Sequence, residues 1–151
     1  MRLAFLLLIA ACGGSKTSEV PVATPPKQTQ EVVPADVAGY WTGDWGQLVL
    51  GERNGKVVGA YSHDEGVIVG SLQAGVLIGW WCEVPSRKPS KDAGDVEMKF
   101  VTIDGKRSID GRWRYGSEGE WREDWDISWD AGTPDPALVK RLDSATTDCV
   151  K

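Results

Sequence analysis

The sequence predicts an all-β protein: a small antiparallel up-and-down meander or barrel of about seven or eight strands, followed by a short C-terminal helix. Three observations predict it. Strand-like segments recur about every 8–12 residues, which is the spacing of short strands joined by tight turns. The dipeptides Asn54-Gly55 and Asp104-Gly105 are strong signals for two-residue hairpin turns. A five-residue pattern centred on glycine also recurs along the chain.

This pattern consists of an apolar residue, any residue, glycine, any residue, and an apolar or aromatic residue. Its copies are Val57 to Tyr61, Ile68 to Leu72, Leu77 to Trp81 and Ile109 to Trp113. A fifth copy, Trp121 to Trp125, has Glu123 in place of the glycine. Residues two apart in a strand share a face, so each copy places its apolar ends and its glycine on one side. We interpret the glycines as points of bending or close backbone approach in a small closed sheet; the alternative is that they line a pocket.

Alternation and turn residues place the strands in order. After a first strand that opens at Gly39, the predicted strands are Gln47 to Glu52, Lys56 to Ser62, Val67 to Leu72, Val76 to Glu83, Asp95 to Ile103, Ser108 to Tyr115 and Glu120 to Asp130. Turns at Asp64-Glu65-Gly66 and Ala74-Gly75 separate the middle strands, and a basic loop, Pro85 to Gly94, breaks the rhythm. The residues of the last strand that we expect on one inner face are Trp121, Trp125, Ile127 and Trp129.

The residues after this β domain, which we place at 39–131, predict a short helix and tail over 132–151. Thr133-Pro134 resembles an N-cap followed by proline at the first helical position. Ala137 to Ala145 fits one helix whose apolar face holds Leu138, Leu142 and Ala145. We expect this face to pack on the barrel.

The first residues have the composition of a signal peptide, which we place at 1–11. Leu3 to Ile9 is an apolar run too short to span a bilayer. The run ends in Ile9-Ala10-Ala11-Cys12, which resembles the lipobox of bacterial lipoproteins. The resemblance implies cleavage before Cys12, diacylglycerol on its thiol, acylation of the new N-terminus by a chain such as palmitate, and attachment to a membrane of the cell envelope. Gly13 next to Cys12 implies the outer membrane under the enteric sorting rule. The alternative is an ordinary secretory signal.

Residues 12–38 predict a disordered tether between the lipidated cysteine and the β domain. Between Gly13 and Ala38 there is no aromatic residue, and Pro21, Pro25, Pro26 and Pro34 are spread among Thr, Ser, Gln and Lys. Such a composition cannot bury enough apolar area to offset the entropy lost on ordering.

Charge and cysteine usage narrow the classes of partner. The formal net charge of −5 argues against a nucleic acid. With Cys12 lipidated, Cys82 and Cys149 remain, and in an oxidising compartment we expect them to form a disulfide. A metal site made of these two cysteines and His63 is the alternative. We predict neither a metal nor a cofactor.

Two short segments resemble the calycins, the superfamily of avidins and lipocalins. They are Gly39-x-Trp41 at the start of the meander and Gly59-Ala60-Tyr61 in a following strand. The resemblance implies an up-and-down barrel. Gly43 and Gln47 stand where avidins carry the polar Asn and Ser of their biotin site, and His63 replaces a hydroxyl residue. No binding residue is therefore transferred.

The candidate ligand contacts are Glu123, Trp81, Trp113 and Trp125, because the pattern places a carboxylate among inward tryptophans. Glu123 on that face would be paired with an arginine, contact a ligand or, least favoured, act in catalysis. We expect most tryptophans to be core, with Trp80 and one of Trp41 or Trp45 outside, where aromatic rings contact a glycan or a protein. No serine nucleophile elbow, HExxH or phosphate-binding glycine loop is present.

These observations favour a lipid-anchored envelope protein whose barrel is a non-catalytic binding or interaction module, with an envelope protein or glycan as partner. The first alternative is a calycin-like carrier of a small apolar or aromatic ligand inside the barrel. The second is an envelope enzyme that uses Glu123. An open or filled barrel interior distinguishes the first two hypotheses.

Overall fold

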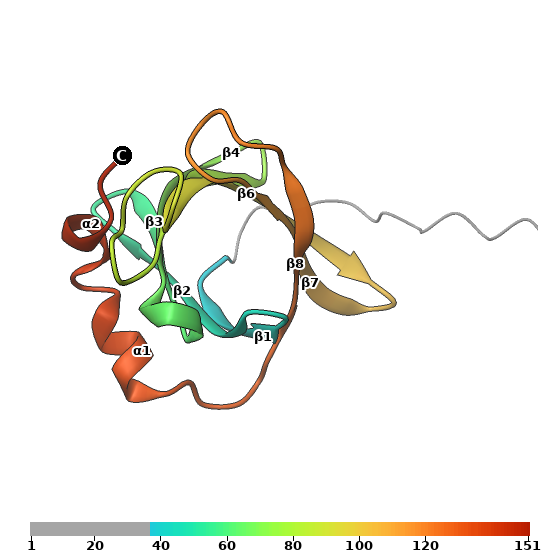
Figure 1. Ribbon diagram of the computed structural model, residues 1–151. Coiled ribbons are helices and arrows are strands. Elements are labelled where there is room, and N and C mark those ends of the chain that lie inside the picture. Colours follow the sequence, from blue (N-terminus) through green and yellow to red (C-terminus); the bar gives the residue numbers. More distant parts are fainter. Residues whose placement is uncertain (1–36) are drawn as a thin grey trace, which may run out of the picture.

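The computed structural model describes residues 37–151, which form a closed barrel of eight antiparallel strands in chain order (Figure 1). The strands are β1 (Gly39–Gly43), β2 (Gly46–Arg53), β3 (Lys56–Tyr61), β4 (Val67–Gln73), β5 (Val76–Cys82), β6 (Ala93–Ile103), β7 (Lys106–Trp113) and β8 (Arg122–Trp129). Closure comes from pairing of β8 with β1. The predicted all-β class with a short C-terminal helical segment is confirmed. The signal peptide, Cys12 and nearly all of the tether lie outside the described residues.

One end of the barrel, here called the turn end, carries the connections after β2, β4 and β6. All three are two-residue turns with positive φ at both central positions, as a type I′ hairpin requires. They are Asn54-Gly55 (φ 53° and 73°), Ala74-Gly75 (48° and 79°) and Asp104-Gly105 (51° and 76°). The chain also enters the barrel here, since Gly39 pairs with Leu50 towards the Asn54-Gly55 turn.

The opposite end, here called the loop end, carries the connections after β1, β3, β5 and β7. The first is a tight turn at Asp44-Trp45, which the sequence pattern does not predict. The second contains a 3-10 helix, η1 (His63–Glu65). The third and fourth are longer loops over residues 83–92 and 114–121.

Side chains from all eight strands fill the barrel interior. The buried interior residues are Trp41, Leu48, Leu50, Val57, Tyr61, Ile68, Leu77, Trp81, Val96, Met98, Phe100, Ile109, Trp113, Trp125 and Ile127. Full burial of one large apolar side chain contributes about 1.5–3 kcal/mol, so this cluster dominates the stability of the domain.

Two central glycines of the recurring pattern allow adjacent strands to approach closely. Gly70 lies directly opposite Gly79 in the β4–β5 pair. A Cβ on Gly70 would lie 2.6 Å from the carbonyl oxygen of Ile78, and a Cβ on Gly79 would lie 2.7 Å from that of Val69. Both distances are too short for a side chain, which supports the structural interpretation of these glycines.

The fifth copy of the pattern does not continue the inner face, because a register shift interrupts the β7–β8 pair. Trp113 pairs with Arg122 and Gly111 pairs with Trp125, so β8 has one residue more than β7 over this interval. The inward placement of Glu123 is therefore wrong: its residue is exposed and lines a hollow on the outer face. Trp121 is also on the outer face.

The C-terminal segment forms two short helices, α1 (Pro136–Arg141) and α2 (Ala145–Asp148), against the outer face of β2, β3 and β4 (Figure 1). The predicted single helix is interrupted because the amides of Leu142, Asp143 and Ser144 bond three residues back rather than four. Its N-cap is Asp135, two residues later than predicted, and this side chain accepts from the Ala137 amide at 2.8 Å.

The predicted apolar face of this segment is nonetheless correct. Leu138, Leu142 and Ala145 are all buried in a second cluster on the outside of the barrel. The same cluster holds the predicted disulfide between Cys82 and Cys149, whose Cα atoms are 5.5 Å apart. The disulfide is therefore confirmed, and it fixes the C-terminal segment to the loop end of β5.

Candidate functional site

Six aromatic side chains gather at the loop end of the barrel, here called the aromatic mouth. They are Trp45, Tyr61, Trp81, Trp113, Tyr115 and Trp125. Strand alternation explains most of the gathering, because the last inward positions of β3, β5 and β7 are Tyr61, Trp81 and Trp113. These side chains line a cavity of about 160 Å³, which is lined further by His63, Asp64, Glu83, Lys91 and Asp92.

Edge-to-face contacts and hydrogen bonds fix the aromatic walls. The ring of Trp113 lies 5.3 Å from that of Trp45, 5.4 Å from that of Trp81 and 5.2 Å from that of Tyr115. Trp113 Nε1 donates to the carboxylate of Asp124 at 2.7 Å. Each contact of this kind adds roughly 0.5–1.5 kcal/mol beyond burial, so the rings form a preformed surface.

One buried polar side-chain atom in these walls has no hydrogen-bond partner among the described residues. The indole Nε1 of Trp125 is buried and has no hydrogen-bond acceptor within the described protein. Trp45 Nε1 and Trp81 Nε1, by contrast, donate to the main-chain oxygens of Asp124 and Arg114, both at 3.1 Å. Because Nε1 itself is buried, an acceptor on a ligand in the cavity reaches it when the Trp125 ring turns towards the cavity.

Polar side chains at the rim come from two loops. His63 Nε2 lies 3.5 Å from Asp64 Oδ2 in η1, and Glu83 follows β5. The hydroxyl of Tyr61 donates to Glu83 Oε1 at 2.8 Å. Burial raises the pKa of Glu83, an effect that its hydrogen bond from Tyr61 offsets only in part. Burial and the neighbouring Glu83 raise the pKa of Tyr61, which therefore stays a hydrogen-bond donor at neutral pH.

The structure brings together three of the four predicted contact residues. Trp81, Trp113 and Trp125 all line the aromatic mouth, whereas Glu123 lies on the outer wall. Sequence reasoning missed His63 and Glu83 as members of this group. A signal was present, since each stands two positions after an inward aromatic residue, Tyr61 and Trp81 respectively, and so continues the same face.

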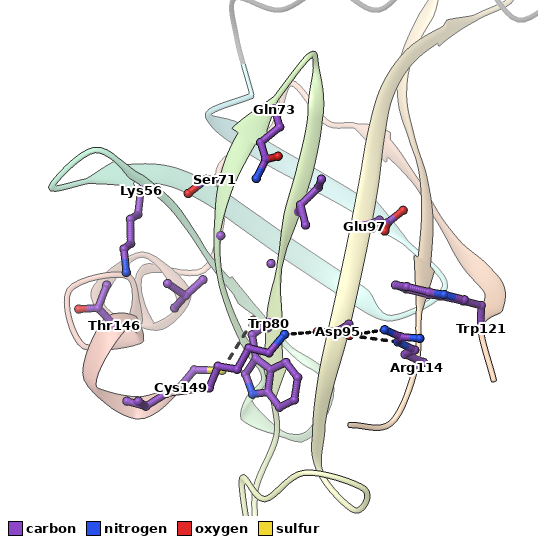
Figure 2. A pocket seen from close by; sticks show the side chains of 16 residues that line it. Lys56, Ser71, Gln73, Trp80, Asp95, Glu97, Arg114, Trp121, Thr146 and Cys149 are labelled. Atoms are coloured by element: carbon purple, nitrogen blue, oxygen red, sulfur yellow. Dashed lines mark hydrogen bonds and ion pairs between the residues drawn. The ribbon is translucent and has the colours of Figure 1, made fainter. Parts of the chain in front are cut away.

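A larger hollow of about 600 Å³ lies on the outer face of β4, β5 and β6 (Figure 2). Trp80 and Cys149 lie on one side of it, and Arg114 and Trp121 on the other. Trp80, which we expected to be exposed, is 5 % exposed because the C-terminal segment covers it.

Three charged groups of this hollow, Asp95, Arg114 and Lys151, pair with one another. Asp95 accepts from Arg114 and from Lys151, both at 2.7 Å, and the guanidinium of Arg114 also lies over the Trp121 ring at 4.6 Å. Burial alone would raise the pKa of Asp95, but the hydrogen bonds from Lys151 and Arg114 outweigh it and lower that pKa. The hollow lies where residues 146–151 pack on the barrel, and the pairs of Asp95 are contacts of that packing. We therefore do not interpret it as a binding site.

Comparison with known proteins gives no significant match, whether to a family model, a curated protein or a solved structure. The resemblances to bacterial lipoproteins and to calycins therefore stay predictions. Among residues 37–151, no helix is long and apolar enough to cross a membrane.

Proposed function

We propose that this chain is a lipid-anchored protein of the bacterial cell envelope. On this proposal the barrel is a binding module that catalyses no reaction. The aromatic mouth is its binding site, and a sugar ring of an envelope glycan is the ligand. The observation that carries the proposal is the small cavity of about 160 Å³ with aromatic walls, carboxylates at its rim and an unpaired donor at Trp125.

Each feature of the cavity suits one part of a sugar ring. Aromatic walls pack against the apolar C–H face of a pyranose, as indole rings pack against other flat apolar groups. The carboxylates of Asp64 and Glu83 accept from hydroxyl groups, and Trp125 Nε1 donates to a ring or hydroxyl oxygen. A cavity of roughly 150 Å³ accommodates one six-membered ring, so the site fits a single sugar unit rather than an oligosaccharide.

The position of the mouth supports an anchored binding module. The chain enters the barrel at the turn end, where Val37 packs against the interior cluster. The mouth is at the other end. A barrel attached through its N-terminal side thus leaves the mouth unobstructed by the attachment. The filled interior favours this module over a carrier that encloses its ligand in the centre of the barrel.

Glycan titration followed by tryptophan fluorescence tests the binding site. The full-length protein in detergent is titrated with muropeptides and with the monosaccharides of envelope glycans. We expect saturable binding, weakened about 5–10-fold by Trp125→Phe, which removes the unpaired donor. Trp129→Phe at the turn end is the matched control and should bind normally. If no envelope glycan binds, or if both variants bind equally well, the proposed site is wrong.

Mass spectrometry tests the anchor separately. The wild-type protein should carry an acyl mass and fractionate with membranes, and Cys12→Ser should lose both. A wild-type protein with no acyl mass would not be lipid-anchored, and this result would contradict the anchored function.

A further inference from the structure

We propose that His63, Asp64 and Glu83 bind a divalent transition metal ion of the Zn²⁺ type at the rim of the aromatic mouth. One imidazole nitrogen and two carboxylate oxygens lie within 4.8 Å of one another, on side chains that all line the cavity. Such a site has three protein ligands and leaves a coordination position for water or a ligand. This inference goes beyond the proposed glycan site and does not depend on it.

The present geometry needs only small side-chain movements to close around an ion. Bonds of about 2.0–2.2 Å in tetrahedral geometry place ligand atoms roughly 3.3–3.6 Å apart. His63 Nε2 and Asp64 Oδ2 are already 3.5 Å apart. The side chains of His63 and Asp64 are 47 % and 60 % exposed, so both can rotate towards Glu83 without displacing core residues.

Contacts around the three ligands hold their backbones and one carboxylate in place. The amide of Val84 donates to the carbonyl of Asp64 at 3.0 Å, which joins η1 directly to the loop after β5. Tyr61 donates to Glu83 Oε1, and the rings of Trp45 and His63 pack in a T-shaped contact with centroids 4.8 Å apart. Partners of this kind orient metal ligands and increase affinity.

A second, independent observation points to an occupant. Trp125 is 2 % exposed, forms part of the cavity wall and has an unpaired Nε1 donor. A water or anionic oxygen on the open coordination position would supply an acceptor inside this cavity once the Trp125 ring turns its buried Nε1 towards it. Buried Nε1 atoms of Trp41 and Trp80 also lack acceptors, but neither residue lines the mouth. Of these three unpaired donors, only that of Trp125 belongs to a residue that lines the same cavity as His63, Asp64 and Glu83.

Charge and donor type select the class of ion. The charged residues that line the cavity include three carboxylates, Asp64, Glu83 and Asp92, and one ammonium group, Lys91. The excess of carboxylates favours a cation. An imidazole ligand favours Zn²⁺, Ni²⁺ or Cu²⁺ over Ca²⁺ and Mg²⁺, which prefer sites made only of oxygen atoms.

Isothermal titration of the metal-stripped, full-length protein tests the site directly, with no histidine tag and no glycan present. We expect one Zn²⁺ per chain, with Ca²⁺ and Mg²⁺ at least tenfold weaker. His63→Ala and Glu83→Gln should each weaken Zn²⁺ binding at least tenfold. Glu83→Gln keeps an oxygen acceptor for Tyr61, so the rim should remain folded. Glu123→Gln, an exposed carboxylate on the outer wall, is the matched control and should bind as the wild type does.

Fluorescence provides a second measurement in the same samples. Cu²⁺ or Ni²⁺ at His63 should quench Trp45, because the two rings are in contact. His63→Ala should abolish this quenching. The proposal is wrong if the wild type binds no Zn²⁺, or if it binds Zn²⁺ with an affinity that His63→Ala and Glu83→Gln leave unchanged. Since no glycan is present, this result is independent of the glycan titration.

Discussion

The two ends of the barrel are built from the same strands but differ in how they are closed. At the turn end, two-residue turns join the strands, and the rings of Trp41 and Trp129 meet at 5.2 Å under the guanidinium of Arg107, which is 4.1 Å from Trp129. At the loop end, Arg122 lies 4.8 Å from the Trp113 ring, yet a cavity remains beside it. Aromatic clustering alone therefore does not distinguish core from site.

What distinguishes the ends is the polar chemistry of the connections. The tight turns place only the short side chains of Asn54, Ala74 and Asp104 at that end, besides three glycines. The longer connections of the loop end bring His63, Asp64 and Glu83 over the aromatic walls. We infer that the turn end stabilises the fold and that the loop end binds.

Replacing one tryptophan with alanine at each end should have the largest effect, and it should separate the role in stability from the role in binding. Trp41 is 1 % exposed, whereas Trp45 is only partly buried in a turn. Trp41→Ala should lower the free energy of unfolding by about 3–5 kcal/mol, since it empties a large core position. Trp45→Ala should cost about 1–2 kcal/mol and instead weaken ligand binding. Urea unfolding and glycan titration measure the two effects; equal losses of stability would remove the distinction between the ends.

Removal of the disulfide should weaken the loop end selectively. Cys82 lies at the loop end of β5, and the bond to Cys149 spans 67 residues. Cys149→Ser should lower the free energy of unfolding by about 2–4 kcal/mol through the loss of this cross-link. Hydrogen exchange should increase in the C-terminal helices and residues 83–92 more than at the turns. Cys12→Ser is the control and should not change the unfolding of the barrel.

The sequence predicted the barrel well because its signals are local. Alternation, the Asn54-Gly55 and Asp104-Gly105 turns and the glycine pattern each depend on residues within one hairpin. The disulfide was also predictable, as Cys12 fits a lipobox and two cysteines remain. The tight turn at Asp44-Trp45 was missed because Trp41 and Trp45 share strand parity, which resembles one continuous strand.

The site was predictable only in part, because an error in the register of one strand changes the predicted face of every residue beyond it. Trp81 and Trp113 stand in regular strands, so their faces follow from parity. Glu123 stands in the interval where β8 has an extra residue, and one inserted residue moves every earlier side chain to the other face. Strand parity places His63 and Glu83 on the inner face one at a time, but their grouping depends on two loops that meet in space, which a local pattern does not record.

The pH dependence of stability tests whether Glu83 is retained for binding. Burial raises its pKa in the folded state, so protonated Glu83 is favoured by folding and ionised Glu83 is not. Without metal, wild type and Glu83→Gln should be equally stable below about pH 4, near the unfolded pKa. As the pH rises through the folded pKa, the wild type should lose stability relative to the variant, by at most about 1 kcal/mol because Glu83 is partly exposed to solvent.

Zn²⁺ should reverse this order at neutral pH. An ion that binds only the folded wild type adds stability that grows with its concentration, and Glu83→Gln should gain little. Thermal unfolding from pH 4 to 8, with and without Zn²⁺, measures both effects. A wild type that is more stable than the variant at neutral pH without metal would mean that Glu83 serves the fold. A wild type that is less stable than the variant without metal, and more stable with Zn²⁺, means instead that Glu83 lowers the stability of the fold and is retained because its carboxylate binds a cation.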